Sequence, residues 1–236
     1  MEVYELKLRK TVSTRYEILQ CATKLFLEKG YTNAYVTAIT KSLRISTGNL
    51  TFWFPTKEHI LAELVKELCD FQQYYIDKKE MAKDDSLLME YLFELAMFAS
   101  VCEKNSNIKD LIISAYTYPL PLEIIRKNDT NRAKYTFGKY CPTWTDTDYV
   151  LAENVASGIE YAMFMTENTT GITIEQRLTS SLDAIMKLYD VPKEKREQLL
   201  AKVMSMDYRT KGNHVFEEFC SFVEEKMLKN YEKLNK

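Results

Sequence analysis

The sequence predicts an all-α protein, and three features of its composition and pattern support this. Of 236 residues only 6 are Gly and 5 are Pro, so the chain is poor in residues that form turns. Tyr (16), Met (10) and Leu are plentiful, and apolar residues recur at helical spacing along most of the chain. Several of the Gly and Pro residues fall between these periodic segments, so long helices joined by short loops are expected.

Four helices are expected in the first third of the chain. The first begins with a capping-box pattern, Thr14 followed by Glu17, and stops at Gly30. Pro55 ends the third helix, and Thr56 caps a long fourth one. The expected ranges are Ser13–Lys29, Val36–Leu43, Thr47–Phe54 and, from Thr56 onward, the fourth helix.

The later helices are expected to form a second domain. The segment Asp84–Glu103 is apolar on nearly every side, so it should run through the middle of that domain. No low-complexity linker is visible, so the fourth helix itself should join an N-terminal head, residues 1–56, to a C-terminal body, residues 57–236. Further helices are expected over 106–117, 120–140, 146–168, 174–189, 193–208 and 213–233, bounded by Pro119, Pro121, Pro142, Gly171, Pro192 and Gly212.

Charge is distributed unevenly between head and body. Residues 1–60 hold nine Lys and Arg against five Asp and Glu, a net charge of +4, whereas the remaining residues carry −6. A basic head on an acidic body predicts a polyanionic partner for the head alone.

Several other classes of function find no support in the sequence. The five cysteines are scattered singly, so neither a disulfide framework nor a metal site is expected. With two histidines, and without an H-x-x-x-H, G-x-G-x-x-G or G-x-S-x-G pattern, no catalytic residues and no cofactor are expected. No apolar run suits a membrane span and the opening residues lack a signal-peptide pattern, so we expect a cytoplasmic protein without membrane contact.

The second and third helices have the pattern of a helix-turn-helix. Both are short, a tight turn joins them, and an amphipathic helix precedes them in the basic part of the chain. Leu50, Phe52 and Phe54 are expected to anchor the third helix on the first and fourth. The opposite face should then enter a major groove, and it carries Thr47, Gly48, Asn49, Thr51 and Trp53.

An ordered series of residues, without a gap, extends this pattern from about Arg15 to Leu61. This series resembles the N-terminal pattern of the TetR family of bacterial transcriptional regulators. The resemblance implies that Thr37, Arg44, Ser46 and Lys57 also contact DNA, Lys57 at the phosphate backbone. The residues that carry it are Arg15, Ile18-Leu19, Cys21-Ala22, Leu25-Phe26, Glu28-Lys29-Gly30-Tyr31, Val36, Ile39, Ile45-Ser46, Gly48, Leu50, Phe54 and Lys57-Glu58.

The chain departs from the family pattern at the turn and in the aromatic run. Thr40 replaces the usual small residue, and Arg44 replaces the usual Gly of the turn, where a left-handed conformation would cost about 1–2 kcal/mol. Thr51 replaces the common Tyr, and Trp53 replaces the usual His. Both side chains can donate to phosphate, so DNA binding is still expected, whereas base preference does not carry over from relatives.

The resemblance implies a TetR-like homodimeric regulator, a repressor that binds a palindromic double-stranded DNA operator and is released by a small organic effector. A second interpretation keeps the fold and loses operator binding, which leaves an interaction module or coactivator. The departures at Arg44, Thr51 and Trp53 are its support.

In this family the C-terminal helices form the two-fold interface. The segment Asp146–Asn168 carries small residues that permit close helix contact, and Ile174–Tyr189 follows it. By position these two helices resemble the family's dimeric pair, although a role in the core alone stays open. The segment after Pro192 extends beyond the usual end of the family and could cover or enlarge the interface.

The family's ligand pocket also lies among the C-terminal helices. Glu94 stands out because it lies in an otherwise apolar helix, and a buried carboxylate needs a partner: either a cationic ligand or an internal Arg or Tyr. The other candidates are Met and aromatic residues, for which plain core packing is the alternative. They are Phe93, Met97, Phe98, Tyr116, Trp144, Tyr161, Phe164 and Met165.

Overall fold

The computed structural model describes residues 2–78, 86–167 and 171–234, and these residues form helices without any strand. The all-α prediction is therefore confirmed. None of the helices in the described ranges combines the length and the apolar character that a membrane span requires. The helices are α1 (Glu2–Asn33), α2 (Val36–Leu43), α3 (Thr47–Trp53), α4 (Lys57–Lys78), α5 (Ser86–Lys104), α6 (Ser106–Thr117), α7 (Pro119–Phe137), α8 (Asp146–Met165), α9 (Ile174–Leu188), α10 (Lys193–Ser205) and α11 (Tyr208–Leu234).

Most expected boundaries agree with the structure to within a few residues, but the first and last helices are longer. The regular helical geometry of α1 breaks at Gly30 as expected, with φ 77° and ψ 162°, but a short further turn follows this kink and extends α1 to Asn33. Gly212 does not separate two helices, because it lies inside α11. Residues 84 and 85 of one expected helix, and residue 168 of another, lie outside the described residues.

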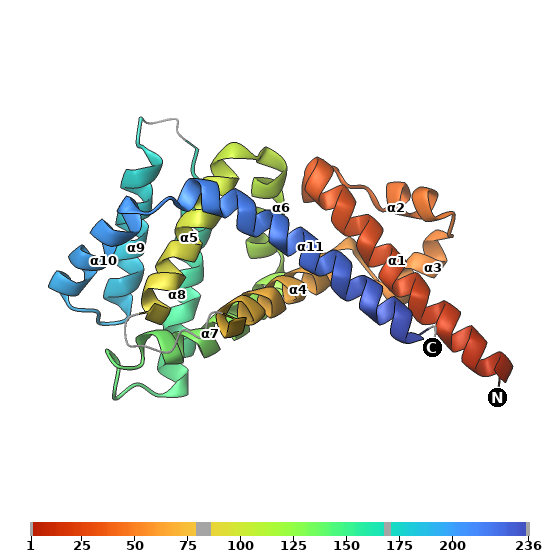
Figure 1. Ribbon diagram of the computed structural model, residues 1–236, viewed down its shortest axis with the longest axis horizontal. Coiled ribbons are helices and arrows are strands. Elements are labelled where there is room, and N and C mark those ends of the chain that lie inside the picture. Colours follow the sequence, from red (N-terminus) through yellow and green to blue (C-terminus); the bar gives the residue numbers. More distant parts are fainter. Residues whose placement is uncertain (1, 79–85, 168–170, 235–236) are drawn as a thin grey trace.

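Figure 1 shows α1, α2 and α3 at one end of the molecule and α9 and α10 at the other, with α4 and α11 running between them. α5 packs against every helix from α6 to α11, so it occupies the middle of the body as its apolar pattern predicts. α10 lies on α9 and α5, whereas α11 crosses α5 and reaches α4 and α1.

The core of the head includes residues from the body. Leu50 and Phe54 of the helix-turn-helix region belong to a buried cluster that also contains Leu111 of α6. Phe219 and Val223 of α11 are buried in the same cluster. The division at residues 56 and 57 thus stays a prediction about chain organisation, since one core spans it.

Candidate functional site

The turn between α2 and α3 is closed by residues that depart from the family pattern. Arg44 adopts a left-handed conformation, with φ 54° and ψ 39°, and its backbone N–H donates to the carbonyl oxygen of Lys41 at 3.4 Å. Thr40 is buried, and its hydroxyl donates to the carbonyl oxygen of Thr37 at 3.1 Å. A buried hydroxyl is tolerated when it has such an acceptor. The turn therefore forms with Thr40 and Arg44 in place.

The third helix is capped by Ser46 and presents polar side chains to solvent. The hydroxyl oxygen of Ser46 accepts from the backbone N–H of Asn49 at 3.1 Å, which satisfies one of the free donors of the first turn. Leu50 is buried beneath the helix. The predicted DNA-contacting residues that the structure places in the open are Thr37, Arg44, Ser46, Thr47, Gly48, Asn49 and Thr51.

The expected roles of Phe52 and Trp53 require a correction. Phe54 is only 2% exposed and Leu50 is buried, as predicted, but Phe52 is 72% exposed and anchors nothing in the core. Trp53 is half-buried and packs against the head core. Residues three and four apart share a helix face, so Trp53 and Phe54 lie on the side of Leu50 while Phe52 points away. Strict helical spacing would have identified this exchange from the sequence.

Lys57 has an intramolecular partner that the sequence did not reveal. Its ammonium group donates to the carbonyl oxygen of Tyr31 at 2.6 Å and lies 4.1 Å from the centre of the Tyr31 ring. Burial lowers the pKa of Lys57, and the nearby carboxylate of Asp110 opposes that shift. A phosphate partner is thus not needed to explain why a cation lies at the start of α4. The ammonium group of Lys57 nevertheless keeps two further N–H donors that could bind a phosphate.

A joint of hydrogen bonds connects the kinked end of α1 to the body. Asp110 of α6 accepts from the backbone N–H and the hydroxyl of Thr32, both at 2.7 Å. A Cβ atom at Gly30 would come within 2.6 Å of Asp110, so this close approach requires Gly in addition to the positive φ. Glu58 of α4 accepts from the backbone N–H of Leu120 at 2.9 Å, at the start of α7. These partners are 62 to 78 residues apart in sequence, beyond the reach of any local pattern.

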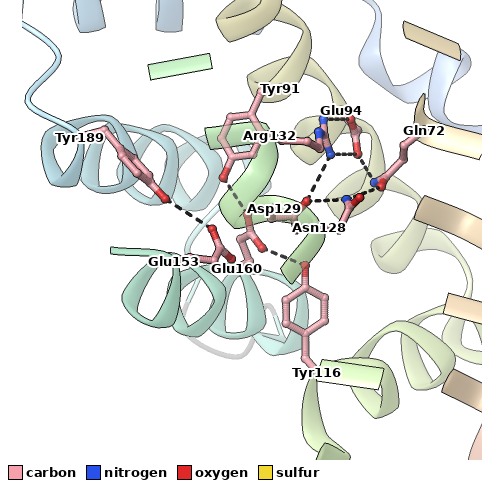
Figure 2. A network of polar contacts seen from close by, with 10 residues as sticks. All are labelled: Gln72, Tyr91, Glu94, Tyr116, Asn128, Asp129, Arg132, Glu153, Glu160 and Tyr189. Carbon is pink, nitrogen blue, oxygen red and sulfur yellow. Dashed lines mark hydrogen bonds and ion pairs between the residues drawn. The ribbon is translucent and has the colours of Figure 1, made fainter. Parts of the chain in front are cut away.

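Figure 2 shows a network of polar side chains between the helices of the body, and the members described first are half-buried. Arg132 of α7 forms ion pairs with Glu94 at 2.7 Å and with Asp129 at 3.5 Å. Gln72 of α4 donates to Glu94 at 2.5 Å and accepts from Asn128 at 3.4 Å. Of the two partners considered for Glu94, the structure supplies the internal arginine.

Two glutamates of α8 extend this group. Tyr91 and Tyr116 each donate to one carboxylate oxygen of Glu160 at 2.8 Å, and Tyr189 donates to Glu153 at 3.4 Å. Burial raises the pKa of Glu153, and the charge of Glu160 adds to the shift. Burial also raises the pKa of Glu160, which the hydroxyls of Tyr91 and Tyr116 oppose. Sequence reasoning missed Glu153 and Glu160, because α8 is not apolar enough to make a carboxylate conspicuous.

Two neighbouring cavities lie between the helices of the body. The first has a volume of about 80 Å³, is mainly apolar, and lies among α4, α5 and α11. The second has a volume of about 60 Å³ and reaches Asp129 and Glu160. Predicted pocket residues Phe93, Glu94, Met97 and Phe98 line the first cavity, and Glu94, Phe98, Tyr116 and Phe164 line the second.

Three predicted pocket residues do not line either of these cavities. Trp144 packs against Tyr149 and Tyr189, with ring centres 5.3 and 5.6 Å apart. Met165 is exposed near the end of α8, and Tyr161 is half-buried. Trp144 thus has the core packing that was the alternative for these aromatic residues.

One face of α8 is apolar and exposed. Leu151, Val155 and Met165 are open to solvent, and Gly158 has no atom within 4 Å of the position that a Cβ would occupy. Together with exposed Ala162 they recur every three or four residues, which places them on one stripe of the helix. We call this set the α8 stripe.

Comparisons with known proteins agree with the geometry of the head. The family model described as "Bacterial regulatory proteins, tetR family" matches residues 18–64, from α1 into α4. No curated protein matches the sequence.

Similar solved structures share little sequence identity with this chain. Full-length native TylP, a TetR regulator from Streptomyces fradiae, is 16% identical over 84% of this chain and 93% of that chain, with a TM-score of 0.49. GusR from Salmonella enterica is 19% identical over 75% of this chain and 96% of that chain, with a TM-score of 0.47. A second structure of full-length TylP has a TM-score of 0.46 at 16% identity, over 84% and 93% of the two chains.

The matched residues are those that build the helix-turn-helix. They include the turn at Arg44, the cap at Ser46 and the buried anchor Leu50. Residues 18–64 of this chain are therefore similar to the helix-turn-helix part of the TetR family of bacterial regulatory proteins.

Proposed function

We propose that the chain is a DNA-binding transcriptional regulator that acts as a homodimer and represses its target by occupying a palindromic operator. The observation that carries this proposal is the open face of α3. Thr47, Asn49 and Thr51 are exposed on a helix that Leu50 and Phe54 anchor from behind. A helix fixed in this way can enter a major groove and present polar side chains to base edges.

The charge of the head supports the same partner. Residues 1–60 carry a net charge of +4 within a chain of net charge −2, so attraction to a polyanion is confined to this end. Arg44 is exposed at the turn, beside the start of α3. Its guanidinium would contact the phosphate backbone while α3 reads the bases, and Lys57 would add a second phosphate contact.

The α8 stripe supports a two-fold dimer. Exposed apolar residues at three- and four-residue spacing are typical of a helix that packs against another helix. Gly158 and Ala162 would let two copies of α8 approach closely. Such a dimer would present two α3 helices to a palindrome, whose half-sites lie about 34–36 Å apart.

The position of the two cavities supports release by a small organic effector. Both are lined by residues of α4, which also carries Lys57 and Glu58 at the joint with α1 and α7. Volumes of about 80 and 60 Å³ are small beside the ~300–1,000 Å³ of ordinary ligand pockets. Gln72 and Glu94 line both cavities, and Glu94 is paired with Arg132. An effector would therefore have to separate these side chains and so displace α4.

A second function has one specific observation in its favour. Phe52 is 72% exposed on α3, and its apolar ring has no donor with which to bind a phosphate. The ring could contact a thymine methyl group, but it could equally serve an interaction module that binds another protein.

Fluorescence anisotropy with two labelled duplexes would test the proposal. One duplex carries the DNA upstream of the protein's own gene, and the other is a scrambled sequence of equal length and composition. We expect the native duplex to bind at least about tenfold more tightly, and Asn49→Ala to weaken that binding by about 1–3 kcal/mol. Asn131→Ala, an exposed Asn on α7, is the matched control and should bind like the wild type. Equal affinity for both duplexes would favour the interaction module.

A further inference from the structure

Three carboxylates from two helices meet inside the body. Asp129 lies on α7, and Glu153 and Glu160 lie on α8, two turns apart. One oxygen from each residue lies within 4.8 Å of the other two. Glu153 is 2% exposed and Glu160 1% exposed, so two members of this acidic cluster are shielded from water, and Asp129 is half-buried. Figure 2 shows it beside the Glu94–Arg132 pair.

Among the described residues, the hydrogen bonds of the two glutamates leave one carboxylate oxygen without a partner. Tyr91 and Tyr116 satisfy the two oxygens of Glu160, and Tyr189 reaches Oε2 of Glu153. Oε1 of Glu153 is buried and accepts no hydrogen bond from any residue in the described part of the chain. A buried acceptor without a donor costs about 1–3 kcal/mol, and more when it is charged.

Positive charge near the cluster is also insufficient. Arg132 pairs with Glu94 and Asp129, so its guanidinium is already shared between two carboxylates. Arg126 acts on Glu153 electrostatically, but its Nε donates to Ser157 at 3.0 Å.

We propose that the acidic cluster binds one divalent metal ion of the oxygen-preferring class, Mg²⁺, Mn²⁺ or Ca²⁺, with Asp129, Glu153 and Glu160 as ligands. Three atoms within 4.8 Å of one another have a common point within about 2.8 Å of each, close to the ~2.0–2.6 Å of metal–oxygen bonds. Oε1 of Glu153 would gain its missing partner. The set contains only carboxylate oxygens, which suit hard cations and not zinc or copper.

The tyrosines around the cluster supply the second layer of the site. Their hydroxyls hold the glutamate carboxylates in place, as the outer partners of metal ligands do. Tyr91 lies on α5, Tyr116 on α6, and Tyr189 follows the last turn of α9. An ion held by α7 and α8 would therefore link five helices of the body.

The size of the cavity favours a metal ion over an organic cation. The cavity that reaches Asp129 and Glu160 measures about 60 Å³, which accommodates an ion with one or two waters. An amine of larger size would have to displace the rings of Tyr116 and Phe164, which line the same cavity.

Titration with Mn²⁺ tests the site directly and needs no DNA. The full chain is stripped of metal with a chelator, and free Mn²⁺ is followed by its electron paramagnetic resonance signal while the ion is added. We expect one Mn²⁺ per chain and a rise in the melting temperature. Glu153→Gln should weaken binding at least about tenfold, because the neutral amide replaces the negatively charged carboxylate as a ligand.

Glu67→Gln is the matched control, since Glu67 is a half-buried carboxylate that lies outside the cluster. It should bind Mn²⁺ like the wild type. Circular dichroism establishes that both variants fold, and Glu153→Gln is expected to fold well because it removes a buried acid. Wild-type affinity in Glu153→Gln would overturn the proposal. So would a wild-type chain that binds no Mn²⁺ at millimolar concentration, or one stabilised by putrescine and not by metal. Failure of DNA binding would leave this site unaffected.

Discussion

At the residue scale, the turn of the helix-turn-helix depends on one residue in a conformation that disfavours it. Arg44 occupies the left-handed region at φ 54°, where most L-residues lose about 1–2 kcal/mol relative to Gly. The arginine is nevertheless exposed and next to the proposed DNA-binding face. Its charge and its strain can therefore be separated by substitution.

We expect Arg44→Gly to raise the free energy of unfolding by roughly 0–1 kcal/mol, since relief of strain exceeds the ~0.5–1 kcal/mol entropic cost of Gly. The same variant should weaken binding to all DNA sequences alike and lower the salt slope by about one. Urea unfolding and anisotropy at several salt concentrations measure the two effects. Arg44→Ala, which loses the charge and keeps the strain, should match the DNA defect without the gain in stability. Unchanged salt dependence in both variants would rule out a phosphate contact.

The aromatic run gives a second prediction about single residues. Phe54→Ala should lower the free energy of unfolding by about 3–5 kcal/mol, because its ring is 2% exposed in the head core. Phe52→Ala should change it by no more than about 0.5 kcal/mol, because its ring is 72% exposed. Thermal or urea unfolding of the two variants provides the comparison. A large loss in Phe52→Ala would mean that this ring is buried in solution.

At the scale of elements, the sequence predicts helices well and their neighbours poorly. Caps and periodicity locate α2, α3 and α6 to within a residue, because these patterns are local. In the sequence Gly212 looks like the end of a helix, yet it lies inside α11. A glycine is found there because α11 packs closely against α5 at this position. A Cβ atom there would lie 3.0 Å from the carbonyl oxygen of Met97 and from the hydroxyl of Ser100.

Gly212→Ala should therefore lower the free energy of unfolding by up to about 2 kcal/mol, because crowding at α5 outweighs the ~1 kcal/mol gain in helix propensity. Gly158→Ala is the matched substitution, since Gly158 also lies inside a helix but faces open space. It should stabilise the monomer by roughly the propensity difference alone. Urea unfolding compares the two, and equal effects would mean that α5 and α11 are not in close contact.

The parts of the site that sequence reasoning missed depend on contacts between distant elements. Asp110 meets Thr32 across 78 residues, and no periodicity within α1 or α6 indicates that pairing. Glu153 and Glu160 meet Asp129 only because α7 and α8 pack together. Glu94 was recognisable because most of its own helix is apolar, whereas α8 also has a long exposed face.

At the scale of the whole molecule, the α8 stripe predicts how two chains associate. Gly158→Trp should dissociate the dimer, because the indole blocks close approach of two α8 helices, while a Cβ atom at this position meets no atom of its own chain within 4 Å. Sedimentation velocity measures the change, and DNA affinity should fall with it, since each half-site would bind alone. Asn131→Trp, on exposed α7 surface, serves as the control. A Gly158→Trp protein that remains dimeric would place the interface on other helices.

The position of α11 also bears on how the protein is made. Phe219 and Val223 help to enclose the core of the head. The ribosome adds them roughly 160 residues after Val65, the last α4 residue of that core before Phe71. Ribosomes add roughly 5–20 residues per second, so roughly 8–30 s pass between the synthesis of Val65 and that of Phe219 and Val223. Over that interval the nascent head exposes the apolar surface that α11 later covers. Chains released before residue 219 should therefore be substrates for chaperones and proteases, and they should not compete with the longer protein for operator DNA.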